Sequence, residues 1–450
     1  MLGTVLDDVI IIGAGVAGLS LARTLARAGK KVRVIEARDR VGGRTFSQVI
    51  DGAPFDVGGQ WFGRGHTRLQ KLAAELGVKT FPQYTEGARV MEVAGKVSTY
   101  KGTNPRLSPF KLIQLQLALS FLHKLEKKID PVRPLDDPKL ALLDAISVEE
   151  LAGKWLFSSA TRDLFAAASR VIFGAEMRDL SALYFLAYAR ASNGFEALVG
   201  SENGAQAIRF VEGAQAISLG IAKELGDRVV LDAPARAIEQ STDEVTVTTP
   251  KGSHRARYLV LAIPPALWLR IEVTPDLPVL HDQLAQRSPM GATVKCLATY
   301  DRAFWREKGL SGESVCDRGP VSVTFDATSN DRPALLAFVV GQDARNWASR
   351  TSEDRRDAIL TTFARLFGNE ALSPRVYHDH DWSTERWTRG CPVAALGPGA
   401  LTSCASALRA PFGRVHVAGT ESAREHIGYI EGALESGERV FGELSSRFAG

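Results

Sequence analysis

The stretch VIIIGAGVAG, from Val9 to Gly18, decides the fold of this chain. Four consecutive apolar residues are typical of a strand that is buried on both faces. Apolar or small residues then recur at helical spacing from Leu19 to Ala28, and Val32 to Glu36 indicates a second strand. The segment therefore predicts a strand–helix–strand unit and, with it, a parallel sheet.

The turn between this strand and this helix carries glycines at positions 13, 15 and 18. In such a turn the first glycine permits the tight bend, the second lets the backbone approach a pyrophosphate, and the third lets helix and strand pack closely. The free N–H groups of the helix N-terminus favour phosphate. Glu36 ends the second strand and can accept hydrogen bonds from ribose hydroxyls, which favours FAD or NAD over NADP.

A second glycine pair follows at Gly42 and Gly43, and it precedes Arg44. This turn can also approach the pyrophosphate, and Arg44 would add positive charge. Together the two turns predict a dinucleotide-binding domain.

Length and composition limit the class of protein. A chain of 450 residues predicts two or three domains. With 45% hydrophobic and 24% charged residues it is not a disordered or low-complexity protein. A net charge of +4 does not indicate nucleic-acid binding, and the lysines at 124, 127 and 128 are interpreted as the solvated face of a helix.

Several absences bear on location. No run of about 18 uncharged apolar residues occurs, so we expect no membrane span. The first 30 residues do not have the pattern of a secretory signal. The four cysteines, at 296, 316, 391 and 404, form no CxxC pair and favour a reducing compartment. We therefore expect a soluble cytoplasmic protein without a membrane partner; the oligomeric state stays open, a homodimer included.

Three separated blocks carry a family resemblance. They are EARDRVGGRT at 36–45, DVGGQW at 56–61, and VAGTE at 417–421 together with GYIEGA at 428–433. With the first glycine turn, they resemble the flavin-containing amine oxidase family, which includes monoamine and polyamine oxidases. The resemblance covers nearly the whole chain.

The resemblance implies FAD as the cofactor. A helix beginning near Ile430 would direct its positive end at the flavin, where the reduced ring carries negative charge. Some family members bind FAD through a thioether to a cysteine at the position of Cys391, whereas others bind it without a bond, and both interpretations stay open here. The cofactor-binding residues implied are Gly13, Gly15, Ala17, Gly18, Glu36, Ala37, Arg38, Gly43, Arg44, Gly58, Gly59, Gln60, Trp61, Val229, Cys391, Gly419, Glu421, Gly428, Tyr429 and Ile430.

The resemblance also implies the reacting residues. Lys295, in the apolar strand pattern 292–298, matches the family lysine that holds a water against flavin N5. Trp382 stands at the family spacing from Cys391 for a tryptophan packed by the flavin. Tyr429 matches one wall of the aromatic cage around the amine. The other wall falls on Pro392, so the full cage is absent.

The implied substrate cavity is mostly aliphatic, which favours a substrate with an apolar body. No mapped acidic residue would bind a second ammonium group, and no mapped arginine would bind a carboxylate. We therefore expect FAD-dependent oxidation of a monoamine to an imine, hydrolysed to an aldehyde or ketone, with O2 reduced to H2O2. The substrate-binding residues implied are Val171, Ile172, Val199, Gln206, Val323, Phe338, Pro392 and Tyr429.

Other functions share parts of these patterns. An amine dehydrogenase, a desaturase or a porphyrinogen-type oxidase would carry the same nucleotide motif, and an escort-type protein would use the fold without flavin. The run His378-Asp379-His380-Asp381 could place two histidines on one strand face as metal ligands, but we interpret it as a polar strand end and expect no metal.

The expected fold class is α/β. A three-layered, Rossmann-like FAD-binding domain would take residues 1–83, 207–290 and 388–450. An inserted α+β substrate-binding domain with a mixed sheet would take residues 84–206 and 291–387.

Overall fold

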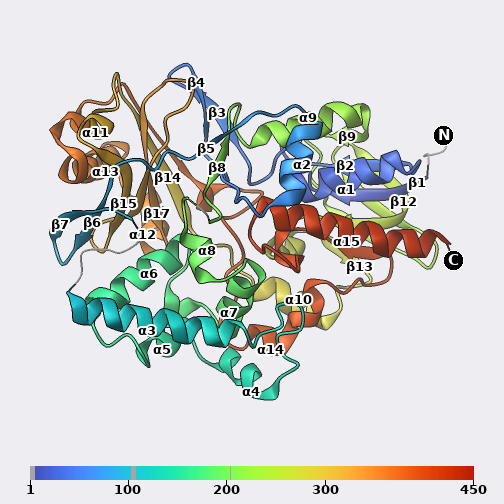
Figure 1. The fold of residues 1–450 in the computed structure, drawn as a ribbon. Coiled ribbons are helices and arrows are strands. Elements are labelled where there is room, and N and C mark those ends of the chain that lie inside the picture. Colours follow the sequence, from blue (N-terminus) through green and yellow to red (C-terminus); the bar gives the residue numbers. More distant parts are fainter. Residues whose placement is uncertain (1–5, 103–107, 203, 450) are drawn as a thin grey trace.

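The computed structural model describes residues 6–102, 108–202 and 204–449. Two large sheets lie at opposite ends of the molecule, and a group of helices lies below and between them in the view of Figure 1. Both described ends of the chain lie beside the first sheet, at the right of the view.

The first sheet has eight strands in the order β13-β10-β11-β12-β1-β2-β9, with β19 also paired to β12. Strands β9, β2, β1, β12 and β19 run parallel, whereas β10, β11 and β12 form an antiparallel meander. The strands are β1 (Asp7–Ile12), β2 (Val32–Ile35), β9 (Val229–Val230), β10 (Ala237–Gln240), β11 (Val245–Thr249), β12 (Gly252–Leu261), β13 (Glu272–Thr274) and β19 (Val415–Val417).

Strand β1 is buried on both faces, which explains its unbroken apolar run. Val9 and Ile11 belong to a core that includes residues of α1 (Val16–Arg27), α9 (Gln215–Leu225) and α15 (Ile430–Ala449). Ile10 and Ile12 belong to the opposite core, which includes residues of α10 (Val279–Gln286) and α14 (Ala400–Cys404). The sheet therefore lies between two layers, as expected for a Rossmann-like domain.

The second sheet is mixed, in the order β18-β14-β17-β16-β15-β6-β7. Only the β15–β6 pair is parallel among its described pairings. One face packs on Trp347 and on α13 (Ser352–Phe367), and the other includes Phe325 and Phe338. Its strands are β6 (Ala88–Val93), β7 (Lys96–Tyr100), β14 (Thr293–Thr299), β15 (Leu310–Cys316), β16 (Val321–Asp326), β17 (Ala334–Val340) and β18 (Val376–Asp381).

Two short antiparallel pairs lie between the large sheets. They are β3 (Ser47–Ile50) with β4 (Ala53–Asp56), and β5 (Thr80–Pro82) with β8 (Ile208–Phe210). The remaining helices are α2 (Thr67–Glu75), α3 (Pro109–Glu126), α4 (Pro138–Ala141), α5 (Val148–Gly153), α6 (Ser159–Phe173), α7 (Ala182–Ala191), α8 (Phe195–Val199), α11 (Phe304–Glu307), α12 (Gln342–Arg345) and α13 (Ser352–Phe367). Within the described ranges, no helix is both long and apolar enough to cross a bilayer.

The expected α/β fold class, with a Rossmann-like domain and a mixed sheet, is confirmed. The first helix begins at Val16, three residues before the expected Leu19, because Gly15 is its N-cap. Strand β12 begins at Gly252, ahead of its apolar residues Tyr258 to Leu261, because its polar half pairs with β11. The lysines at 124, 127 and 128 are exposed, but only Lys124 lies in a helix, because α3 (Pro109–Glu126) ends before the other two.

Candidate cofactor and substrate site

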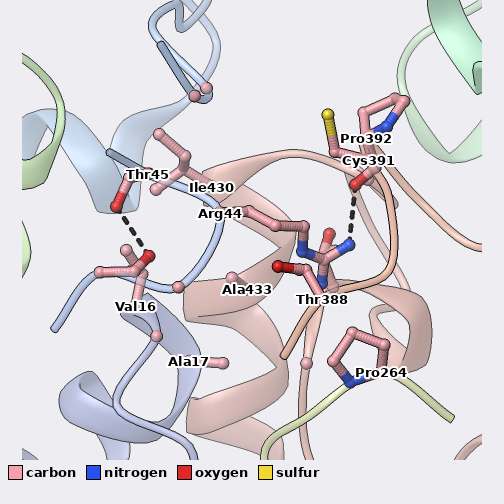
Figure 2. Close-up of a pocket in the computed structure, with 18 of the residues that line it drawn as sticks. Val16, Ala17, Arg44, Thr45, Pro264, Thr388, Cys391, Pro392, Ile430 and Ala433 are labelled. Carbon is pink, nitrogen blue, oxygen red and sulfur yellow. Dashed lines mark hydrogen bonds between the residues drawn. The ribbon is translucent and has the colours of Figure 1, made fainter. Parts of the chain in front are cut away.

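One continuous cavity connects the two sheets. At one end it is lined by Gly13 and Glu36, which follow the carboxyl ends of β1 and β2, the usual ligand edge of a parallel sheet. At the other end it is lined by Lys295 of β14 and Phe338 of β17. Figure 2 shows Arg44, Cys391 and Pro392 close together beside this cavity.

The nucleotide end of the cavity is built from backbone. Gly13 has φ +107°, and a Cβ there would lie 2.7 Å from the Ala262 carbonyl oxygen. A Cβ on Gly18 would overlap the carbonyl oxygen of Gly13. Gly15 faces open space, and a Cβ on Gly43 would lie 3.3 Å from its Cα. Because these glycines have no side chain, the two backbone turns can approach each other and leave their main chain open to a pyrophosphate.

Glu36 is held at the end of β2 by main-chain donors. Its Oε2 accepts a hydrogen bond from the Ala14 N–H at 2.8 Å, and its Oε1 accepts one from the Arg38 N–H at 3.0 Å. Its side chain is buried but lines the cavity. A carboxylate has further lone pairs, so Glu36 can also accept from ribose hydroxyls.

Arg44 links the second glycine turn to the C-terminal motif. Its guanidinium makes a two-pronged ion pair with Glu421, with one N–O distance of 2.9 Å, and donates to the Pro392 carbonyl oxygen at 2.7 Å. Such paired geometry is the strong form of arginine–carboxylate contact. The charge of Arg44, expected to face a pyrophosphate, is therefore balanced within the protein.

Lys295 is buried in the middle of the site. Its Nζ donates to the carbonyl oxygens of Asp56 at 2.7 Å and Gly58 at 2.8 Å, and to Oε1 of Gln60. Burial lowers the pKa of Lys295 to about 7, although the nearby Asp56 carboxylate opposes this shift. An amine with this pKa can exchange a proton near neutral pH.

Cys391 and Tyr429 line the same cavity as Lys295. Burial raises the pKa of the Cys391 thiol to about 12, and burial also raises the pKa of Tyr429. Both groups are therefore protonated and neutral near pH 7. The backbone of Cys391 is fixed by a hydrogen bond from the Thr293 hydroxyl to its carbonyl oxygen at 2.9 Å.

The far end of the cavity is apolar and aromatic. Trp61 packs edge-on against Phe325 at a centroid distance of 4.8 Å and lies 5.8 Å from Phe338. The indole N–H of Trp61 donates to Oε1 of Gln83 at 2.8 Å, which fixes its orientation. Val171 and Ile172 of α6 complete this wall.

Most of the residues expected at the site do line the cavity. They are Gly13, Gly15, Ala17, Glu36, Ala37, Arg38, Gly43, Arg44, Gly58, Gly59, Gln60, Trp61, Val171, Ile172, Gln206, Lys295, Phe338, Cys391, Pro392, Gly419, Gly428, Tyr429 and Ile430.

Six expected residues lie outside the cavity lining, as far as the described residues show: Gly18, Val199, Val229, Val323, Trp382 and Glu421. Trp382 is fully buried; a Cβ on Gly58 would lie 3.0 Å from its ring, and its indole N–H donates to the Val57 carbonyl oxygen at 2.7 Å. Trp382 thus supports the glycine segment from behind.

The other five have identifiable positions. Gly18 and Glu421 act through Gly13 and Arg44, as described above. Val229 pairs with β2, and Val323 is buried on β16. Val199 is 41% exposed, and its neighbour Leu198 is the α8 residue that reaches the cavity.

The sequence did not indicate several other lining residues. Tyr188 is the clearest case: it lies in α7, where every residue except Arg190 is buried and the pattern predicts only core, yet a Cβ on Gly428 would overlap its hydroxyl. The glycine at 428 could have signalled a close neighbour, but not which one. The other lining residues missed include Leu198, Ala205, Thr293, Trp387, Thr388 and Thr420.

The residues present fit FAD. The two backbone turns suit a pyrophosphate, Glu36 suits a ribose, and the same cavity continues to a buried lysine and an apolar chamber.

Comparison with known proteins defines the class. The family model for flavin-containing amine oxidoreductases matches residues 16–440, and the chain belongs to this family. A Dictyostelium discoideum protein named "Probable flavin-containing monoamine oxidase A" is 39% identical over 447 residues, covering 98% of both chains.

Two solved structures are equally similar in fold. Wild-type putrescine oxidase bound to putrescine has a TM-score of 0.95 at 33% identity and covers 99% of this chain and 100% of its own. Cyclohexylamine oxidase from Brevibacterium oxydans IH-35A has a TM-score of 0.95 at 32% identity, with the same coverage.

Proposed function

We propose that this chain is an FAD-dependent oxidase of monoamines with an apolar body. The observation that carries the proposal is the cavity itself, which runs without interruption from the nucleotide turns to an apolar chamber. Of the described residues that line it, Glu36 is the only acidic one, and Glu36 stands at the nucleotide end. The chamber therefore offers no carboxylate to a second ammonium group.

Each reacting residue has a role in this proposal. FAD, when bound, supplies the two-electron acceptor for the amine. Tyr429 presents one aromatic wall to the amine, and the place of a second ring is taken by Pro392, which leaves room for a bulky substituent. Lys295 exchanges a proton in the closed part of the cavity. Overall, amine, O2 and water give a carbonyl compound, ammonia and H2O2.

The expected domain division remains part of this proposal. All eight strands of the first sheet come from residues 1–83, 207–290 and 388–450, and all seven strands of the second come from 84–206 and 291–387. This distribution supports a FAD-binding domain and a substrate-binding domain with those boundaries, and the cavity would lie between them.

A cytoplasmic location is also proposed. The four cysteines are free thiols in the described structure, and three of them are buried. This supports a reducing compartment. Fractionation of the source cells with an antibody to the chain tests it, and recovery with an extracellular fraction would contradict it.

The first experiment is the visible spectrum of the purified protein. We expect a flavin band, at least after FAD is added, and its absence would overturn the proposed function in favour of a flavin-free binding protein. Acid precipitation then tests Cys391. Colour in the pellet that is lost in Cys391→Ala indicates a thioether, whereas colour in the supernatant shows FAD held without a bond.

The second experiment tests the substrate class. Hydrogen peroxide release is measured with cyclohexylamine and with putrescine as substrates. We expect kcat/KM for cyclohexylamine to be higher by about a hundredfold, because an unpaired ammonium in an apolar chamber costs several kcal/mol. Preference for putrescine would contradict the monoamine assignment. Substrate reduction of the flavin without peroxide release would indicate a dehydrogenase.

A further inference from the structure

Gln60 has an unusual position beside the buried lysine. It follows Gly58 and Gly59 after β4, it is only 3% exposed, and it lines the cavity. Its amide oxygen accepts the hydrogen bond from Lys295 that completes the set made with Asp56 and Gly58. In the protonated state Lys295 has three N–H groups, and protein oxygens accept all three.

This arrangement leaves no N–H of the ammonium for a cavity ligand. The donor left over belongs to Gln60: its Nε2 is buried and has no hydrogen-bond partner among the described residues. A buried, unpaired amide donor costs about 1–3 kcal/mol. Such groups are uncommon in native proteins, so each calls for a partner that binds there.

We propose that Gln60 is the positioning residue of Lys295, and that its amide nitrogen donates a hydrogen bond to the flavin ring. The amide thus joins the lysine to the cofactor: its oxygen accepts from Lys295, and its unpaired nitrogen belongs to a side chain that lines the cavity. The inference rests on FAD occupying this cavity, as in the proposed function. It adds a direct contact between Gln60 and the flavin to the expected role of Lys295, which is to hold a water against the flavin.

The surroundings of Lys295 make the role measurable. The titratable and charged groups near it are Asp56 of β4, Arg209 of β8, Cys391 and His380 of β18. Gln60 is uncharged and touches Lys295 directly. Replacing the Gln60 side chain therefore shifts the equilibrium between the ammonium and the neutral amine of Lys295, while those four residues stay unmutated.

Two variants of similar length act in opposite directions. Gln60→Glu places a carboxylate against the ammonium and should raise the pKa of Lys295 by about one unit or more. Gln60→Met removes an acceptor that favours the ammonium and should lower the pKa of Lys295. A side chain that only fills space would not produce two shifts of opposite sign.

The readout is a pH titration of the flavin absorption band in the resting holoenzyme. We expect an inflection near the Lys295 pKa of about 7, moved upward in Gln60→Glu, downward in Gln60→Met, and absent in Lys295→Met. Identical midpoints in wild type and both Gln60 variants, or shifts of the same sign, would overturn the proposal.

A second measurement tests the amide nitrogen. The affinity for FAD is compared in a Cys391→Ala background, so that no thioether can form. Gln60→Met should weaken binding about fivefold, as expected for the loss of one hydrogen bond; unchanged affinity would show that Nε2 does not contact the flavin. If the wild type binds no flavin at all, the proposed function fails; if flavin binds but the titrations coincide, only this inference fails.

Discussion

The two ends of the cavity are built from different materials. The nucleotide end is main chain: its shape comes from glycines at 13, 15, 18 and 43, all within one short segment. The reacting end is side chains: Gln60, Lys295, Cys391 and Tyr429 come from four distant segments. A site made of backbone imposes a residue type at a fixed spacing, whereas a site made of side chains depends on how strands and helices are placed against each other.

The largest expected effect is a loss of stability from a substitution at the nucleotide end of the cavity. Gly18→Val would place its side chain against the Gly13 carbonyl oxygen. We expect a loss of about 3 kcal/mol or more of unfolding free energy, because the overlap lies between a helix and a central turn. Denaturant unfolding of the apoprotein measures it.

Gly15→Ala is the matched control. A Cβ at position 15 has no neighbour within 4 Å, and the backbone there is extended at φ −74°. The apoprotein should stay within about 1 kcal/mol of wild-type stability. FAD affinity should nevertheless fall at least about tenfold, because the backbone must approach the pyrophosphate. Equal losses of unfolding free energy in Gly18→Val and Gly15→Ala would contradict the assignment of Gly18 to packing and of Gly15 to FAD binding.

The next largest effect concerns Lys295 at the reacting end of the cavity, whose contribution to the free energy of unfolding depends on pH. In the unfolded chain a lysine titrates near pH 10.4, whereas burial lowers the pKa of Lys295 to about 7. Between these values the unfolded state binds more protons, so the lysine makes the stability of the wild type rise with pH. The rise should total about 4 kcal/mol from pH 7 to pH 10.

Lys295→Met isolates this contribution. The unfolding free energy of the wild type minus that of the variant should rise as pH rises from about 7 to about 10, because the lysine contributes this rise only in the wild type and methionine does not titrate. Chemical unfolding at a series of pH values measures the difference. A difference independent of pH would mean that the folded lysine is not shifted.

The smallest effect separates the ring of Tyr429 from its hydroxyl. Burial raises the pKa of Tyr429, so the hydroxyl stays neutral, and the proposed role needs only the aromatic face. Tyr429→Phe should change kcat/KM by less than about threefold, whereas Tyr429→Leu should lower it about tenfold, as expected for lost aromatic contact. Steady-state peroxide assays compare them, and an equal loss in both would assign the role to the hydroxyl.

The same contrast explains what the sequence could predict. The strand β1, its turn and Glu36 could be predicted from adjacent residues, because each step has a local physical requirement. The pairing of Arg44 with Glu421, 377 residues apart, could not be predicted from either block alone. Every residue of α7 except Arg190 is buried, so no periodicity distinguished Tyr188, which lines the cavity, from its neighbours in the core.

Trp382 shows a different limit. Its spacing from Cys391 was recognised by resemblance, but its position behind Gly58 depends on β18, an edge strand whose polar residues give little sign of which face is buried. Gln60 was expected as a cofactor residue because it lies in the DVGGQW block. Its contact with Lys295 required knowing that β14 passes beside the end of β4.

The strand order also fixes when the cofactor can be captured during synthesis. Strands β1 and β2 are translated before the other strands of their sheet, but β1 gains its second neighbour only with β12, and β12 also pairs with the much later β19. Gly419, Tyr429 and Glu421, the partner of Arg44, are translated after every strand of both large sheets, and Glu421 follows Arg44 by 377 residues. The nucleotide turns are thus made long before the residues that complete the cavity, so flavin uptake by the complete site comes late in folding, and chaperones would meet an apoprotein with its central sheet unfinished.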